Sequence, residues 1–244
     1  MRFEVWAQTD VGLKREINQD AILVDHEINL FVVADGMGGH KGGEVASALA
    51  VETVQEVIAK RRSEPKLQPR KILQDAYREA SSRIHHKSTH ESPELMGMGT
   101  TMVLMWEYRD RLYVGNVGDS RAYLFHASRL WQLTEDHSLI NEQVRAGVIS
   151  EEDAPHVMGR NVITRSVGFE KEVSVDIFER EPQGEELYIL CSDGLCGLVL
   201  PEKLEAIFQT SPPEEVVAKC INEAKAAGGD DNISVIVIRT KVGG

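Results

Sequence analysis

Apolar runs typical of β-strands come in groups in this chain, and pairs of amphipathic helices separate the groups. The expected strands cover residues 3–9, 21–25, 30–35, 100–108, 111–117, 121–125, 130–133, 173–180, 186–192 and 233–240. The expected helices cover residues 43–62, a second segment ending near 86, and 138–146, 202–209 and 214–226. This order lacks the strict strand–helix alternation of a doubly wound parallel sheet. It predicts an α+β sandwich of antiparallel sheets covered by helices.

The overall charge limits the partners of the chain. Its 244 residues include 27 Lys and Arg against 39 Asp and Glu, which gives a formal net charge of −12. Nucleic acid and acidic membrane surfaces would be repelled, and only 6% of the residues are aromatic, few for stacking on bases. We therefore expect neither nucleic acid nor a membrane as a partner.

Domain organisation and compartment follow from what the sequence lacks. No linker-like composition divides it, so residues 1–244 are predicted to form a single domain. The first ten residues have no apolar core of a signal peptide, and no apolar run approaches the ~18 residues of a membrane span. Cys191, Cys196 and Cys220 contain no C-x-x-C pair and suggest no disulfide framework. A reducing cytoplasm is the expected location.

Acidic residues next to glycine stand at the ends of several expected strands. Asp35, Asp119 and Asp193 each follow an apolar run, and Asp230 and Asp231 precede the last strand. Taken alone, each of these is an ordinary turn, and this interpretation stays open for every one of them. Taken together, the four turns would place several carboxylates at the same end of stacked sheets. Hard oxygen ligands of this kind suit Mg²⁺ or Mn²⁺.

Other chemistries have less support in the sequence. The glycine-rich segment 36–43 matches neither the dinucleotide-binding fingerprint nor the P-loop, because it lacks the Gly-Lys-Ser/Thr ending. Zinc prefers His and Cys, and we expect the adjacent His85 and His86 to lie on a largely exposed helix. Cys196 follows the turn at Asp193 without the C-x₅-R phosphate loop of a cysteine nucleophile.

Seven short motifs occur along the chain in the order typical of one protein family. They are TDVG at 9–12 with Arg15 and NQD at 18–20, DGMGGH at 35–40, GTT at 99–101, GNVGDSR at 115–121, LTEDHS at 133–138, SDGL at 192–195 and GDDN at 229–232. From about residue 3 to 238, the chain thereby resembles the metal-dependent PPM (type-2C) family of protein serine/threonine phosphatases, in its compact bacterial form. The resemblance implies a four-layer α-β-β-α sandwich, in which helix pairs flank two antiparallel sheets and a metal centre lies at one end.

The resemblance also implies ligands for two Mn²⁺ or Mg²⁺ ions per chain. By position, Asp35 would bridge both ions, and the backbone carbonyl of Gly36 would bind one of them. Asp193 and Asp231 would hold the other ion. Asp20 would support the centre through bound water.

Further roles come from the same resemblance. Asp119 matches an acid that, with Asp193, binds a weaker third ion in this family. Arg15 matches the arginine that grips the substrate phosphate, and it completes a catalytic set with Asp35, Asp193 and Asp231. The segment 137–168 falls where the family has its flap beside the active site.

Among the departures from the family pattern, one concerns the general acid. Animal members carry a histidine, proposed as general acid, where this chain has Met37. A thioether cannot donate a proton, so a metal-bound water or His40 would take that role.

The implied reaction is hydrolysis of phosphoserine and phosphothreonine monoesters. A water or hydroxide that bridges the two metals would attack phosphorus directly, without a covalent phosphoenzyme. The implied partners are phosphorylated proteins and a cognate bacterial Ser/Thr kinase that the enzyme opposes, and we expect a monomer. Two alternatives stay open: a binding module that keeps the fold without catalysis, and an enzyme for a small phosphorylated metabolite. The choice between Mn²⁺ and Mg²⁺ also stays open.

Overall fold

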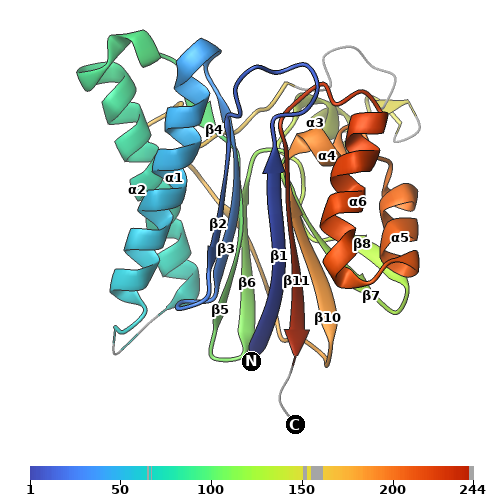
Figure 1. Ribbon diagram of the computed structural model, residues 1–244. Coiled ribbons are helices and arrows are strands. Elements are labelled where there is room, and N and C mark those ends of the chain that lie inside the picture. Colours follow the sequence, from blue (N-terminus) through green and yellow to red (C-terminus); the bar gives the residue numbers. More distant parts are fainter. Residues whose placement is uncertain (65, 67, 151–152, 155–161, 242–244) are drawn as a thin grey trace.

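The computed structural model describes residues 1–64, 66, 68–150, 153–154 and 162–241. Within them, two β-sheets face each other, and helices cover the outer face of each (Figure 1). All strand pairs are antiparallel. The predicted α-β-β-α sandwich is confirmed.

The first sheet joins the two ends of the chain. Its strand order is β1 (Arg2–Asp10), β11 (Ile233–Lys241), β10 (Glu186–Cys191), β7 (Arg121–His126) and β8 (Arg129–Gln132). The second sheet has the order β2 (Asp20–Asp25), β3 (Leu30–Met37), β5 (Met102–Tyr108), β6 (Arg111–Val117) and β9 (Asp176–Arg180), and β4 (Gly99–Thr100) pairs with the end of β3. Strand β3 is apolar on both faces because both are covered, which explains its continuous run Leu30–Ala34.

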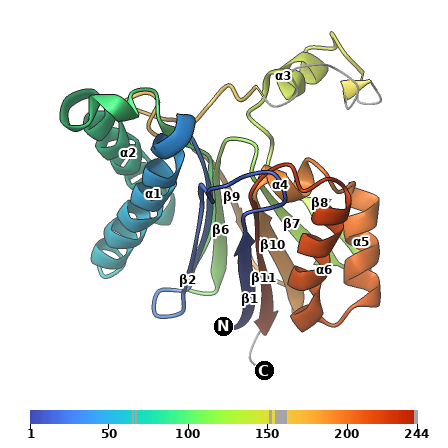
Figure 2. The same ribbon diagram turned by 45° about the horizontal axis from the view of Figure 1, so that its top comes forward.

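Pairs of helices form the outer layers (Figure 2). On the second sheet lie α1 (Gly39–Arg61) and α2 (Pro69–His86), and α2 continues into a short π-helical turn, Lys87–Glu91, and a 3₁₀ turn, Pro93–Leu95. On the first sheet lie α5 (Pro201–Thr210) and α6 (Pro213–Ala226), with the short α4 (Asp193–Cys196) beside them. Burial of apolar stripes such as Ile72, Ala76 and Ile84 holds these layers in place. Within the described residues, no helix combines the length and apolar character needed to cross a bilayer.

The interior between the sheets is built from alternate residues of both. Phe31, Val33 and Val103 of one sheet share a buried cluster with Leu190 and Ile236 of the other. This cluster fixes how the two sheets face each other and therefore where their strand ends meet.

Two element boundaries differ from the prediction by three residues or more, and the predicted strand 100–108 is divided into β4 and β5. Helix α1 begins at Gly39, four residues before the predicted start, because the glycine-rich first turn offers no apolar periodicity to detect. Strand β9 begins at Asp176 instead of residue 173, although Val173 and Val175 still pack against the core.

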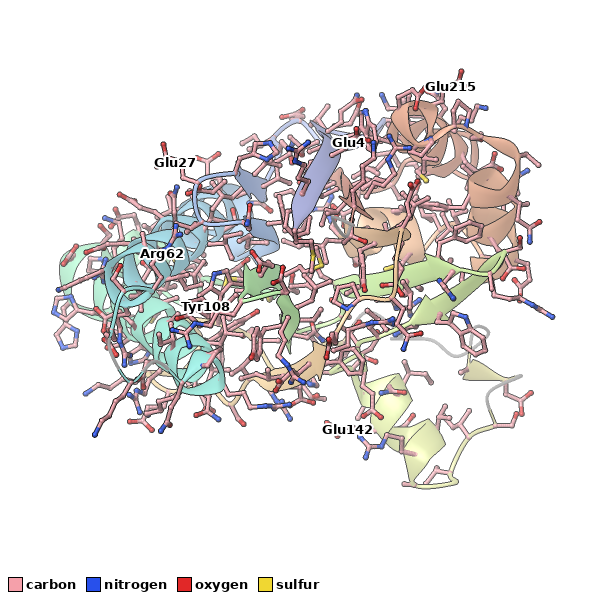
Figure 3. All side chains as sticks on the ribbon, turned by 90° about the horizontal axis from the view of Figure 1, so that it is seen from below. Glu4, Glu27, Arg62, Tyr108, Glu142 and Glu215 are labelled. Atoms are coloured by element: carbon pink, nitrogen blue, oxygen red, sulfur yellow. The ribbon has the colours of Figure 1, made fainter. Side chains whose placement is uncertain are left out.

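The small helix α3 (Leu139–Arg145) stands apart from the four layers. None of its side chains is buried, and Glu142 on it lies away from both sheets (Figure 3). Ser138 caps the helix, because its Oγ accepts a hydrogen bond from the backbone N–H of Asn141 at 3.3 Å. The predicted short helix at 138–146 is thus present.

Candidate active site

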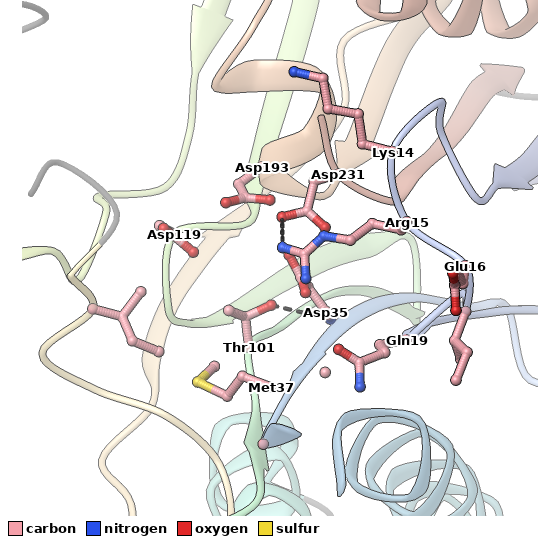
Figure 4. A pocket seen from close by; sticks show the side chains of 14 residues that line it. Lys14, Arg15, Glu16, Gln19, Asp35, Met37, Thr101, Asp119, Asp193 and Asp231 are labelled. Atoms are coloured by element: carbon pink, nitrogen blue, oxygen red, sulfur yellow. Dashed lines mark hydrogen bonds and ion pairs between the residues drawn. The ribbon is translucent and has the colours of Figure 1, made fainter. Parts of the chain in front are cut away.

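A pocket of about 700 Å³ opens at one end of the sandwich, opposite the chain termini. Asp35, Asp119, Asp193 and Asp231 line it together with Arg15 (Figure 4). The backbone of Gly36 also lines this pocket, so six of the seven predicted site residues reach one cavity.

Strand ends of both sheets supply the carboxylates. Asp35 lies near the end of β3 and Asp119 follows β6, both in the second sheet. Asp193 begins α4 and is separated from the end of β10 by one residue, and Asp231 is separated from the start of β11 by one residue; both strands belong to the first sheet. The seventh predicted residue, Asp20, begins β2 and pairs in register with Asp35, so it lies behind the pocket.

The adjacent Asp230 takes a different position. Its side chain is 54% exposed and forms an ion pair with Lys14, with 2.6 Å between Oδ1 and Nζ. Of the two consecutive acids, only Asp231 is therefore turned into the pocket.

Two glycines allow the backbone to approach closely enough for this convergence. A Cβ on Gly194 would lie 2.0 Å from the carbonyl oxygen of Asn232, so only glycine lets the Asp193 turn lie against the Asp231 turn. A Cβ on Gly36 would lie 2.0 Å from the carbonyl oxygen of Gly43 in the first turns of α1.

The clustered carboxyls are poorly compensated. Burial, followed by the charges of neighbouring acids, raises the pKa of Asp20 to about 6 and that of Asp119 to about 7. Burial and the charges of Asp20 and Asp193 raise the pKa of Asp35 well above its ordinary value. The pKa of Asp193 is raised as well, mainly by burial. Carboxyls with pKa values shifted in this direction would be stabilised in their charged form by a nearby cation.

Unpaired oxygens give the same indication. Oδ1 of Asp20 and Oδ1 of Asp193 are buried and have no hydrogen-bond partner among the described residues. Unpaired buried acceptors are costly, and these belong to hard carboxylate ligands. The residues present therefore fit a hard divalent cation such as Mg²⁺ or Mn²⁺. This conclusion rests on the chemical type of the side chains, which are carboxylates, and not on a finished coordination geometry. Among the described residues, no three His, Cys, Asp or Glu side chains are already arranged as a metal-binding group.

Two histidines lie close together but likewise form no metal-binding group with other described residues. The rings of His86 and His90, four residues apart in sequence, stack with their centroids 4.9 Å apart, a spacing that the sequence interpretation passed over. They belong to no metal-binding group in the described part of the chain.

Arg15 is held at the pocket by the loop that carries it. Asn232 clamps this loop: its Nδ2 donates to the carbonyl oxygens of Val11 and Ile17, both at 3.0 Å, and its Oδ1 accepts from the N–H of Gln19 at 2.8 Å. The Arg15 side chain is 51% exposed, and its Nη2 lies 2.7 Å from Oδ2 of Asp231. Asn232 received no role in the sequence analysis, although it follows the Asp pair directly.

Two hydroxyl residues support the acids and were likewise missed. Ser192 Oγ donates to Oδ2 of Asp20 at 2.8 Å, and Thr101 Oγ1 accepts from the backbone N–H of Asp35 at 3.2 Å. Both belong to motifs that the sequence displays, but a hydroxyl in a motif does not reveal which carboxyl it contacts. Met37 lines the pocket as expected, whereas the side chain of His40 lies outside the described residues.

The predicted flap, 137–168, is tied to the body at its start, and backbone hydrogen bonds join its two ends to each other. The N–H of His137 donates to the carbonyl of Gly118 at 2.9 Å, and its carbonyl accepts from the N–H of Thr164 at 2.8 Å. The N–H of Leu139 donates to the carbonyl of Val162 at 2.8 Å. Residues 151–152 and 155–161 of this segment lie outside the described residues.

Comparison with known proteins defines the class. Residues 13–219 match the family model of protein phosphatase 2C. The chain belongs to this family, and it is a metal-dependent protein phosphatase.

Bacterial members are the relatives that it resembles. It is 37% identical to the serine/threonine phosphatase Stp of Listeria monocytogenes, over 95% of this chain and 93% of that protein. The crystal structure of the serine/threonine phosphatase PstP of Mycobacterium tuberculosis superimposes with a TM-score of 0.90 at 33% identity, covering 98% of this chain and 99% of that one. A structure of the PstP catalytic domain, in complex with two manganese ions, superimposes with a TM-score of 0.87 at 32% identity and the same coverage.

Proposed function

We propose that this chain hydrolyses phosphoserine and phosphothreonine monoesters in proteins at a centre of two Mn²⁺ or Mg²⁺ ions. One observation carries the proposal: half-buried carboxyls from both sheets share a pocket with Arg15. Among the described residues, neither Oδ1 of Asp193 in that pocket nor Oδ1 of Asp20 behind it has a hydrogen-bond partner. The serine/threonine phosphatase of Listeria monocytogenes and the manganese-bound PstP domain support the substrate class and the metal.

The proposed ligands come from both sheets. Asp35 would hold both ions, and the carbonyl of Gly36 would bind one of them. Asp193 and Asp231 would bind the other, and Asp20 would act through water from its position behind the pocket. Asp119 lines the same pocket and, with Asp193, would hold a weaker third ion.

Each group has a distinct part in the reaction. When bound, divalent ions lower the pKa of a coordinated water and offset negative charge on the phosphoryl oxygens. Arg15 binds the phosphate, because its planar guanidinium has five N–H donors and the bond to Asp231 uses few of them. Asn232 keeps the Arg15 loop in place for this contact. Met37 cannot supply a proton to the departing serine or threonine oxygen, so water or His40 does so.

The proposal also covers the domain organisation, location and partners of the enzyme. Residues 1–244 form a single phosphatase domain with a flap at about 137–168. The protein acts as a monomer in the cytoplasm on phosphorylated proteins, where it opposes a bacterial Ser/Thr kinase.

One assay tests this function against its rivals. Purified protein is treated with EDTA and then given a phosphothreonine peptide or a hexose phosphate, with and without millimolar Mn²⁺ or Mg²⁺. We expect metal-dependent release of phosphate from the peptide and far less from the sugar. Preference for the sugar would point to a metabolite phosphatase. Absence of turnover on either substrate, with peptide binding retained, would point to a binding module.

A further inference from the structure

A second pocket, of about 550 Å³, lies beside the catalytic pocket and shares two of its lining residues, Met37 and Ile163. Its other wall is formed mainly by the segment 164–174, which includes the last residues of the flap and continues toward β9. We call this second pocket the side groove. Because the two cavities adjoin, a chain whose phosphorylated residue enters the catalytic pocket can extend directly into the side groove.

The wall of the side groove is fixed to the body of the protein. Val167 and Thr100 exchange backbone hydrogen bonds of 2.9 and 2.8 Å, which attach the segment to β4. Ser81 on α2 holds it again, because its Oγ accepts from the N–H of Gly168 at 2.9 Å and donates to the carbonyl of Glu170 at 2.7 Å. This wall is therefore a rigid platform.

An aromatic side chain projects from this platform. Phe169 is 64% exposed and lines the side groove, although its backbone is anchored on both sides and its carbonyl lies 3.2 Å from Nδ1 of His85. Holding a large apolar ring in water gains nothing for the fold. A fixed aromatic ring at the rim of a pocket is instead the kind of anchor that dominates binding interfaces.

The charges in the side groove are negative. Glu170 and Glu172 line it, and neither carboxylate forms an ion pair with any described residue. The cationic Arg165 is already engaged, since its Nη1 lies 2.8 Å from Oδ1 of Asp176. The side groove therefore offers two uncompensated carboxylates next to an aromatic ring.

We propose that the side groove binds the stretch of a phosphoprotein next to its phosphorylated residue, with an apolar side chain on Phe169 and a Lys or Arg at Glu170 and Glu172. This proposal rests on the proposed function, because the phosphorylated residue itself occupies the catalytic pocket. It adds a sequence preference that the metal centre alone does not supply, since that centre reads only the phosphate.

Phosphothreonine peptides of varied sequence test the preference. A Leu–Lys pair is placed at successive positions up to about four residues on either side of the phosphothreonine, since an extended chain advances about 3.3–3.6 Å per residue. The reference peptide has Ala and Gln in their place. We expect kcat/KM of the wild-type enzyme to rise about 10-fold at one register, the scale of a single modest anchor contact.

Two variants assign that preference to the side groove. Phe169→Ala should remove the gain from Leu, and Glu170→Gln/Glu172→Gln should remove the gain from Lys. Hydrolysis of a small aryl phosphate should stay within about twofold in both, because these side chains lie outside the catalytic pocket. The matched controls are Trp131→Ala, an exposed aromatic on β8, and Glu202→Gln/Glu214→Gln on the opposite helical layer. Both controls should keep the full preference.

Measurements of peptide binding distinguish a failure of this proposal from a failure of the proposed catalytic function. Fluorescence anisotropy of the labelled peptides, with the protein in EDTA, reports occupancy of the side groove without turnover. Tighter binding of the Leu–Lys peptide, lost in the groove variants, supports the side groove even for a catalytically silent protein. Equal affinity and equal kcat/KM for all registers, or an undiminished preference in the groove variants, would overturn it while leaving metal-dependent hydrolysis intact.

Discussion

The catalytic pocket and the side groove adjoin, yet they are built in opposite ways. In the catalytic pocket, acidic side chains are partly withdrawn from water at the ends of strands from both sheets. Within the described part of the chain, Oδ1 of Asp193 there and Oδ1 of Asp20 behind it have no hydrogen-bond partner. In the side groove, the acidic side chains are exposed, and an aromatic ring stands beside them. The first arrangement is costly without a cation, whereas the second costs the fold little. Phosphate chemistry and recognition of the surrounding sequence should therefore be separable by mutation.

The largest effect is expected at Asp35, the centre of the buried acids. Asp35→Asn should abolish turnover, because it removes the carboxylate proposed to hold both ions. The metal-free protein should be as stable as the wild type or more so, since one of several repelling charges is gone. Most of the rise in melting temperature caused by millimolar Mn²⁺ should also disappear.

Thermal melts in EDTA and in Mn²⁺, together with peptide hydrolysis, check this expectation. Asp230→Asn is the matched control, because it removes an acid of the same motif that faces solvent and Lys14. It should keep both the activity and the response to Mn²⁺. A wild-type melting temperature that does not respond to Mn²⁺ would contradict the metal centre and favour ordinary turns.

Arg15 should show the next largest effect. Arg15→Ala should lower kcat/KM on phosphopeptides by about 10- to 100-fold, the worth of a hydrogen bond to a charged group. The Mn²⁺ concentration needed for half-maximal activity should change by only a few-fold. Arg15→Lys should recover part of the loss, because it restores the charge without the planar fork. Native kcat/KM for Arg15→Ala would remove this residue from phosphate binding.

Only part of the fold and of the site could be predicted from the sequence. Periodicity placed the strands and helices, and the acid-bearing turns pointed to one end of the sandwich. Residue type and spacing could not separate Asp231 from Asp230, since both lie in one turn after Gly229. The family resemblance selected Asp231, and the packed fold shows the physical reason, because it turns Asp231 into the pocket and Asp230 toward Lys14. It could not assign Asn232 as the clamp of the Arg15 loop, because the bonds reach across more than 200 positions.

The side groove escaped sequence analysis for a similar reason. Phe169 looks like a core residue in a list of apolar positions, and its exposure follows from how Ser81 and Thr100 hold its neighbours. The sequence motifs identify the residues around the phosphate. The surface proposed to bind the rest of a substrate contains no motif of this kind.

The pH dependence of stability should sharpen the contrast between buried and exposed acids. The folded-state pKa of Asp20 is raised to about 6 and that of Asp119 to about 7, so the folded protein binds protons more tightly than the unfolded chain. This contribution is complete below about pH 4 and is lost as pH rises through the folded pKa values. The metal-free protein should therefore be more stable at pH 5.5 than at pH 7.5, by about 2–3 kcal/mol.

Urea melts in EDTA at these two pH values measure this difference. Asp119→Asn should reduce it, whereas Glu170→Gln/Glu172→Gln should leave it unchanged, because those acids are exposed. Saturating Mn²⁺ should shrink or reverse it, since cations compete with protons for the same carboxylates. A metal-free protein that becomes more stable toward pH 7.5 would show that the buried acids are compensated in some other way.

The smallest effect is expected on the flap, which flanks the catalytic pocket without contributing an acid to it. Changes within 148–160 should alter selectivity among phosphopeptides more than hydrolysis of a small aryl phosphate. Much of that range lies outside the described residues, so Val148, whose side chain is 72% exposed, is the position to change. Val148→Ser should shift the ratio of kcat/KM between two phosphopeptides by about two- to fivefold, the scale of one partly exposed apolar contact. Val148 does not line the catalytic pocket, so hydrolysis of a small aryl phosphate should not change. If both substrates slowed equally, the flap would act on the chemistry of the catalytic pocket, and selection of the surrounding sequence would be left to the side groove alone.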